Sequence, residues 1–183
     1  ATRQVTVEVS GEVVFEGNET FTVVLSNPSA GWSIGDGQGL GTIQNDDVQP
    51  SLAIADLTQF EGTGGSTAFT FQLTLSAPSG FPVSGSFSTT DGSAVAPGDY
   101  AASVLVPFIF PPGTTSTGIT VQVVADAAAE PVEDFTASLA LVAGAALADG
   151  IAQAAILDDD GAPQLAIGDA SGLEGTGLST SLV

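Results

Sequence analysis

Apolar and polar residues alternate along most of this chain, which is the pattern of strands that bury one face. The clearest run is 69–75, FTFQLTL, in which every second residue is Phe or Leu and the residues between are Thr or Gln. Short turn sequences rich in Gly, Pro and Asp separate the runs. Similar runs predict further strands at 4–9, 21–25, 52–55, 83–89, 104–110, 119–124, 135–141 and 150–157.

Two local features refine this prediction. Pro107 interrupts the run 104–110, and because proline has no amide hydrogen, we expect this strand at a sheet edge or a bulge. The Ala-rich stretch 125–130 is too short for a stable helix and is followed by Pro131. The pattern therefore predicts an all-β fold, a sandwich of seven to eight strands.

The chain repeats itself at an interval of 113 residues. The sequence IQNDD at 43–47 returns as ILDDD at 156–160, and LAIAD at 52–56 returns as LAIGD at 165–169. A repeat of this length is a whole domain rather than a short solenoid unit. We therefore predict the C-terminal part of one module over 1–48, a complete module over 49–161 and the start of another over 162–183, as in a piece of a longer tandem array.

The composition narrows the possible functions. There are 21 acidic residues against one basic residue and no His, which gives a net charge of −20 and argues against nucleic acid and anionic membranes as partners. With 43% apolar and only 12% charged residues, the chain is a folded protein rather than an acidic disordered tail. No stretch of about 18 apolar residues is uninterrupted, so we expect no membrane insertion.

Catalysis is not expected. A Ser or Cys nucleophile needs a base, and the chain has no His, Lys or Cys. Paired carboxylates run glycosidase chemistry, but a site repeated at each module boundary argues against that use. The single Trp32 and single Tyr100 are interpreted as packing residues rather than a sugar-stacking platform.

The acidic residues of the complete module occur in clusters. Glu61 follows the first strand, Asp99 lies in a central loop, a third group occupies 126–134, and the triplet 158–160 ends the module. In an up-and-down sandwich, loops separated by an even number of strands emerge at the same end. We therefore expect the clusters to converge on one tip.

Calcium is the ion that such a tip favours. Like charges about 4 Å apart repel by about 4 kcal/mol at an effective dielectric constant near 20, and no nearby basic side chain relieves this. Ca²⁺ takes six to eight oxygen ligands, Mg²⁺ uses fewer carboxylates, and zinc or copper would need His or Cys. The alternative is that the acids are solvated loop charges, and we prefer it for Asp36, Asp91 and Asp149, each followed by Gly.

Four motifs in this order resemble the Calx-beta family, whose modules occur in the regulatory loop of sodium–calcium exchangers and in large bacterial surface proteins. The motifs are FEG at 60–62, TDGSA at 90–94 leading to GDY at 98–100, the acidic loop from Asp126 to Phe135, and ILDDD at 156–160. The resemblance implies an immunoglobulin-like antiparallel β-sandwich that binds Ca²⁺ at one tip.

The resemblance also implies which residues hold the ion. In the first segment Glu12 stands where Asp126 does and Glu16 matches Glu130, while Asn45 replaces the first acid of the triplet. A further departure is Ala125, where high-affinity exchanger modules carry an acid. The implied ligands are Glu61, Asp99, Asp126, Glu130, Asp158, Asp159 and Asp160 in the complete module, Glu12, Glu16, Asp46 and Asp47 before it, and Glu174, the match of Glu61, after it.

The expected function is that of a non-catalytic structural repeat module in a long extracellular protein, an adhesin or surface fibre, which Ca²⁺ stiffens at module tips and junctions. Its partners would be neighbouring modules and other copies in a fibre. A composition without Lys or Cys and rich in Gly, Ser, Thr and Ala is typical of secreted or cell-surface bacterial proteins. Two alternatives stay open: a calcium-sensing regulatory module, and an accessory module of a secreted polysaccharide-degrading enzyme.

Overall fold

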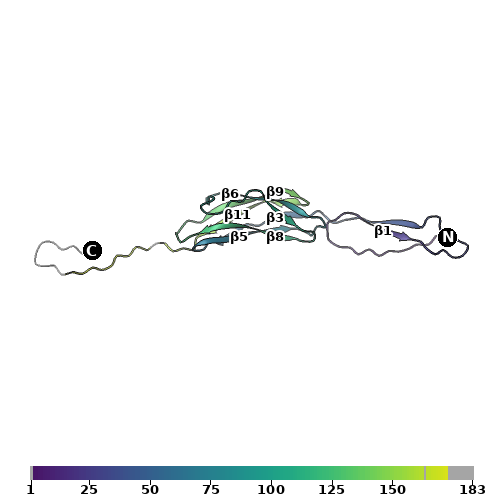
Figure 1. The fold of residues 1–183 in the computed structure, drawn as a ribbon, viewed down its shortest axis with the longest axis horizontal. Helices are drawn as coiled ribbons and strands as arrows, with labels where there is room; N and C mark the ends of the chain where they lie inside the picture. Colours follow the sequence, from purple (N-terminus) through teal and green to yellow (C-terminus); the bar gives the residue numbers. More distant parts are fainter. Residues whose placement is uncertain (1, 163, 173–183) are drawn as a thin grey trace.

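The computed structural model describes residues 2–162 and 164–172, which form strands and loops (Figure 1). Within these ranges no helix is present, and thus none that could cross a membrane. The strands are β1 (Glu19–Val24), β2 (Gln38–Ile43), β3 (Ser51–Ile54), β4 (Leu57–Phe60), β5 (Gly65–Leu75), β6 (Val83–Asp91), β7 (Val106–Phe110), β8 (Ser116–Ala125), β9 (Glu133–Ala143), β10 (Ala146–Asp149) and β11 (Ile151–Leu157).

Strands β3 to β11 form a sandwich of two sheets, ordered β10-β3-β5-β8 and β4-β11-β9-β6-β7. The predicted all-β sandwich is confirmed, with nine strands instead of seven to eight because the sequence pattern missed the four-residue strands β4 and β10. The expected up-and-down order is wrong. The chain crosses from one sheet to the other between β3 and β4, and the pairs β3–β10 and β4–β11 run parallel.

The alternating residues of the long strands form the core between the sheets. In β5 every second residue from Phe69 to Leu75 is buried, as the sequence predicts. Across the core, Phe71 packs against Phe87 and Phe135 with ring centroids 5.5 and 6.0 Å away. Strand β7, which carries the interrupting proline, lies at the edge of its sheet as expected.

One predicted core position points outward. Leu141 was expected on the apolar face of its strand, but it is 78% exposed and has a φ angle of 53°. The register between β9 and β6 shifts here, because Ser84 pairs with Ala143 while Ser86 pairs with Ala140. An extra residue in one strand of an antiparallel pair forms a bulge, which turns the side chain away from the core.

Residues 2–48 extend from one end of the sandwich, and the segment after β11 leaves from the other end (Figure 1). Strands β1 and β2 form an antiparallel pair, but the strand expected at 4–9 is absent, and residues 2–13 are exposed. Its counterpart in the sandwich is β8, which is stabilised by pairing with β5. No strand equivalent to β5 lies beside 4–9 among the described residues, so the alternating pattern alone does not produce strand pairing there.

Trp32 is 78% exposed, so its expected packing role is wrong.

Candidate metal centre

Three of the predicted acids meet at the end of the sandwich where β4 and β11 finish. These strands are parallel neighbours, with Leu157 paired to Phe60, so the chain leaves both at the same tip. Glu61 follows β4, and Asp158 and Asp160 follow β11. Each of the three offers one carboxylate oxygen, and these oxygens all lie within 4.8 Å of one another. Two oxygens bound to one Ca²⁺ at about 2.5 Å are at most about 5 Å apart, so this spacing fits a shared ion.

Backbone hydrogen bonds hold the Glu61 loop against the triplet. The Glu61 amide donates to the carbonyl of Leu157 at 3.0 Å, and the Gly62 amide donates to the Asp159 carboxylate at 3.0 Å. The Asp160 amide donates to the Asp158 carboxylate at 3.1 Å. Asp159 therefore positions the loop through one of its oxygens, while Glu61, Asp158 and Asp160 face each other.

Two oxygens of this cluster are buried without a hydrogen bond. Glu61 is only 6% exposed, and neither its Oε1 nor Oδ2 of Asp160 has a partner among the described residues. A buried unpaired carboxylate is costly, and such groups are normally hydrogen-bonded, paired with a positive charge or bound to a metal. The site thus combines closely spaced carboxylate oxygens with two buried oxygens that a positive charge would stabilise.

The pKa values of Glu61 and Asp160 also indicate that their ionised forms lack stabilising partners. Burial raises the pKa of Glu61 to about 7, and the negative charges of Glu130, Asp126, Asp158 and Asp160 add to the effect. Burial also raises the pKa of Asp160, with Asp158 as the next cause. These shifts arise because the ionised carboxylates are desolvated and face like charges. A bound divalent cation would offset both effects, because its positive charge favours the ionised carboxylates.

Asp126 and Glu130 approach the cluster from the loop between β8 and β9. Both are exposed, and their charges raise the pKa of Glu61, which places them around the same tip. One oxygen of Asp126 accepts a hydrogen bond of 2.7 Å from the Ala128 amide, which shapes the loop. Together with the three close acids they supply only hard oxygen donors, the set that suits Ca²⁺ and not zinc or copper.

Asp99 occupies a different position on this end of the sandwich. Its carboxylate accepts a hydrogen bond of 2.7 Å from the Val95 amide, and it lies outside the group of three close acids. Its charge raises the pKa of Glu133, after the larger effect of burial. The charge of Asp99 therefore acts on Glu133, the first residue of β9, which was not among the predicted ligands.

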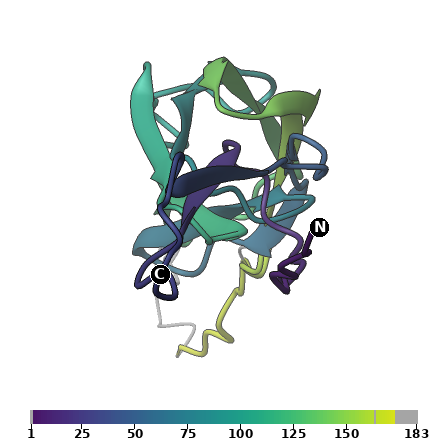
Figure 2. The same ribbon diagram turned by 90° about the vertical axis from the view of Figure 1, so that its right-hand side faces the viewer.

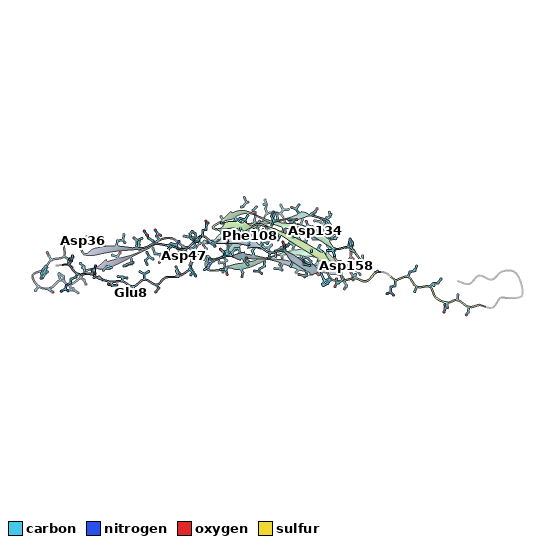
Figure 3. The ribbon with its side chains drawn as sticks, turned by 180° about the vertical axis from the view of Figure 1, so that it is seen from behind. Glu8, Asp36, Asp47, Phe108, Asp134 and Asp158 are labelled. Atoms are coloured by element: carbon cyan, nitrogen blue, oxygen red, sulfur yellow. The ribbon has the colours of Figure 1, made fainter. Side chains whose placement is uncertain are left out.

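The predicted acids of the first segment lie at the opposite end of the sandwich from the three close acids. Figure 3 shows this separation by its labels for Asp47 and Asp158. Glu12, Glu16, Asp46 and Asp47 line one cavity formed by the loop before β1 and the linker after β2. A hydrogen bond with Glu12 raises the pKa of Glu16, and the neighbouring acids add to this. Glu174 lies outside the described residues.

The acids assigned to turns have that role. Asp36 and Asp149, which are 113 residues apart, each accept a hydrogen bond from the amide two residues ahead, at 3.1 and 3.2 Å. Asp91 does more than cap a turn. It accepts hydrogen bonds from the Tyr100 hydroxyl at 2.7 Å and the Ala96 amide at 3.1 Å, and so fastens the loop that carries Asp99.

Comparison with known proteins gives a consistent result. A family model described as "Calx-beta domain" matches residues 1–47 and 44–160. The solved structure of the apo form of the Calx CBD1 domain is 24% identical in sequence, with a TM-score of 0.53, and the match covers 62% of this chain and 100% of that one. No curated protein matches the chain.

Two longer solved structures are also similar. CBD12 from CALX1.2 and the calcium binding domain CBD12 of CALX1.1 are each 26% identical to this chain, with TM-scores of 0.54 and 0.52. In both cases the match covers 60% of this chain and 46% of the other, so this chain spans less than half of those two structures.

Proposed function

Since the chain belongs to the Calx-beta domain family, we propose that its sandwich is a non-catalytic Ca²⁺-binding module in the tandem array of a long extracellular protein. The observation that carries the calcium assignment is the pair of buried oxygens on Glu61 and Asp160 without partners. A relative with 26% identity is described as a calcium binding domain, which supports the same use of the site here.

The ion would be held by Glu61, Asp158 and Asp160, with Asp126 and Glu130 completing the oxygen set. When bound, it supplies positive charge that offsets the repulsion and desolvation of these carboxylates. The five acids come from the loop after β4, the loop after β8 and the segment after β11. A common ligand would therefore hold these three segments together.

The placement of the site supports a structural role. Asp158 and Asp160 follow the last strand, which ends at Leu157, and belong to the segment that leads away from the sandwich (Figure 1). A ligand bound there would restrict the direction in which the following segment leaves. The 113-residue repeat and the acidic, Cys-free composition support a tandem array on a bacterial surface, with neighbouring modules as partners. Association of copies into a fibre stays a prediction.

Thermal unfolding of the chain with millimolar Ca²⁺ and then with chelator tests the proposal. Binding to the folded state alone stabilises it by about 2.7 kcal/mol when the free ion is at 100 times Kd, so Tm should rise with Ca²⁺. Replacing Asp158, Asp159 and Asp160 together by Asn should abolish the rise. Asp149→Asn is the matched control, because it removes a charge from a turn outside the cluster. An equal Tm with and without Ca²⁺ would refute the calcium assignment.

Calorimetric titration with Ca²⁺ then separates a structural module from a sensor. Extracellular modules bind Ca²⁺ with Kd values of about 10⁻⁴–10⁻³ M, whereas sensors bind at about 10⁻⁷–10⁻⁵ M. The structural proposal expects the weaker range. A Kd of about 10⁻⁵ M or lower would instead favour a sensing module.

A further inference from the structure

The loop before β1 is bound to the sandwich through Phe15. The Phe15 amide donates a hydrogen bond of 3.2 Å to the carbonyl of Pro78, and the Gly80 amide donates one of 2.8 Å to the carbonyl of Phe15. These bonds form a parallel bridge between Phe15 and Ser79. The contact joins residues 2–48 to the β5–β6 connection of the sandwich, so it is an interface between two predicted modules.

Side chains close the same interface. The Phe15 ring meets the Phe81 ring edge to face, with centroids 6.2 Å apart and planes at 67°. Edge-to-face packing is a favourable arrangement for two aromatic rings, so the pair adds to the backbone contact. At Gly80 an added Cβ would lie only 3.0 Å from Cβ of Glu16, so the small residue permits this close approach.

The receiving surface is already fixed within the sandwich. Ser79 is only 2% exposed, and its hydroxyl accepts a hydrogen bond of 3.0 Å from the Phe81 amide. Its carbonyl accepts another, of 2.8 Å, from the Gly113 amide. Phe15 therefore docks on a preformed surface rather than on a loose loop.

Asn45 ties the docking loop to the linker. Its Oδ1 accepts a hydrogen bond of 3.3 Å from the Glu16 amide, and its Nδ2 donates one of 3.1 Å to the carbonyl of Asp47. Its own amide donates one of 3.0 Å to the Asn18 side chain. An amide side chain supplies both a donor and an acceptor, whereas an ionised carboxylate only accepts. Asn45 thus connects the loop and the linker with neutral hydrogen bonds.

The tip at the other end of the sandwich has no residue equivalent to Phe15 and none equivalent to Asn45. Aligning Glu16 with Glu130 and Phe21 with Phe135 puts Ala129 at the place of Phe15. The counterpart of Asn45 is Asp158, whose carboxylate accepts a hydrogen bond from Asp160 in its own segment. The two tips of this chain therefore differ in how their loops are held.

We propose that Phe15 and Asn45 form a joint that fixes residues 2–48 on the following sandwich without a bound cation. The partner surface of Phe15 is the segment 78–81, and Asn45 takes the place of a ligand acid by bonding the loop directly. This inference is independent of the calcium assignment, because it depends on hydrogen bonds and an aromatic contact between neutral groups.

Distances between two spin labels test the joint in the full chain. The chain contains no Cys, so Thr22→Cys with Ser116→Cys places one label on β1 and one on β8, both at exposed positions. Pulsed electron paramagnetic resonance should give one narrow distance distribution in chelator and the same distribution in millimolar Ca²⁺. A broad distribution in chelator that narrows only with Ca²⁺ would overturn the proposal while leaving the calcium assignment intact.

Substitutions test which residues hold residues 2–48 on the sandwich. Phe15→Ala should replace the narrow distribution by a broad one, and Val13→Ala, an exposed position in the same loop, should not. Asn45→Asp removes the donor to the Asp47 carbonyl and adds a charge among the neighbouring acids, so it should broaden the distribution in chelator. Unchanged thermal unfolding of the sandwich in each variant separates loss of the joint from loss of the fold. A narrow distribution in Phe15→Ala, or in Asn45→Asp with chelator, would contradict the proposal.

Discussion

The Gly62 amide donates a hydrogen bond of 3.0 Å to the Asp159 carboxylate, although 97 residues separate the two. This bond connects the loop between β4 and β5 to the segment that follows the last strand of the sandwich. It holds the Glu61 loop against the acidic triplet. Backbone pairing of β4 with β11 and the Asp159 carboxylate therefore bring the other acids of the centre together.

Asp159→Ala should lower the free energy of unfolding by about 1 kcal/mol, the net value of a typical intramolecular hydrogen bond. Asp159→Asn is the matched control, because its carbonyl oxygen still accepts the bond from Gly62. Urea denaturation in chelator measures both. Equal losses in the two variants would show that the charge and not the hydrogen bond matters.

Stability in chelator should fall as the pH rises from about 4.5 to 7. The pKa of Glu61 is about 7 in the fold against an ordinary 4.5, so the folded state binds more protons than the unfolded state in this window. This contribution is complete below pH 4.5 and is lost as the pH passes through 7. Raised pKa values at Glu133 and Asp160 act in the same direction. Tm at pH 5 should exceed Tm at pH 8, and a Tm that rises over this range would contradict the expectation.

Glu61→Gln should make the chain more stable in chelator at pH 8 and weaken its Ca²⁺ binding. The substitution keeps the size of a side chain that is 6% exposed but removes its charge. We expect Ca²⁺ affinity to fall by about tenfold or more, which is about 1.4 kcal/mol. Melting curves with and without Ca²⁺, together with calorimetry, measure both effects. Glu8→Gln, at an exposed position outside the cluster, should change neither.

Tyr100→Phe should destabilise the loop that carries Asp99. The Tyr100 ring is 1% exposed and stacks on Phe135 with centroids 4.2 Å apart, an arrangement that Phe can keep. Loss of the Tyr100 hydroxyl should cost about 1–2 kcal/mol in denaturation experiments. The bond from this hydroxyl is the main cause of the lowered pKa of Asp91, so the difference from wild type should be present above pH 3.8 and shrink below it. A difference independent of pH would instead assign the loss to packing.

Gly92→Ala should be strongly destabilising. An added Cβ would lie 2.4 Å from the backbone oxygen of Asp134, which cannot move without disturbing β9. Overpacking of this kind costs about 1–3 kcal/mol, and contact with backbone favours the upper end. Gly161→Ala is the control, because nothing lies within 4 Å of its added Cβ. Thermal unfolding of the two variants should differ, and equal Tm values would contradict this account of Gly92.

Much of the fold follows from short-range patterns. The alternation in 69–75 predicted a strand with one buried face, and the proline in 104–110 predicted a strand at a sheet edge or a bulge. The first is present as β5, and the second, β7, lies at a sheet edge. The strand predicted at 4–9 is absent and Leu141 is turned outward, because both depend on the neighbour with which a strand pairs. Periodicity records which residues are apolar, and it carries no information about the partner.

The chemistry of the candidate centre could also be predicted from the sequence, whereas its geometry could not. The acidic residue types, their order and the missing His and Cys were enough to point to calcium and to the Calx-beta family. The sequence did not show that Glu61, Asp158 and Asp160 are the three close acids, that Asp159 accepts a hydrogen bond from a backbone amide, or that the charge of Asp99 acts on Glu133.

The sequence by itself determined the all-β class, the 113-residue repeat and the oxygen-only chemistry, because these depend on residue type and on the two-residue period of a strand. Only the tertiary structure decided which acids share a tip and that Phe15 reaches the loop at 78–81. These relationships depend on β4 lying parallel to β11 and on contacts between residues far apart in the chain. Long-range pairing is a property of the whole fold, and no local stretch of sequence specifies it.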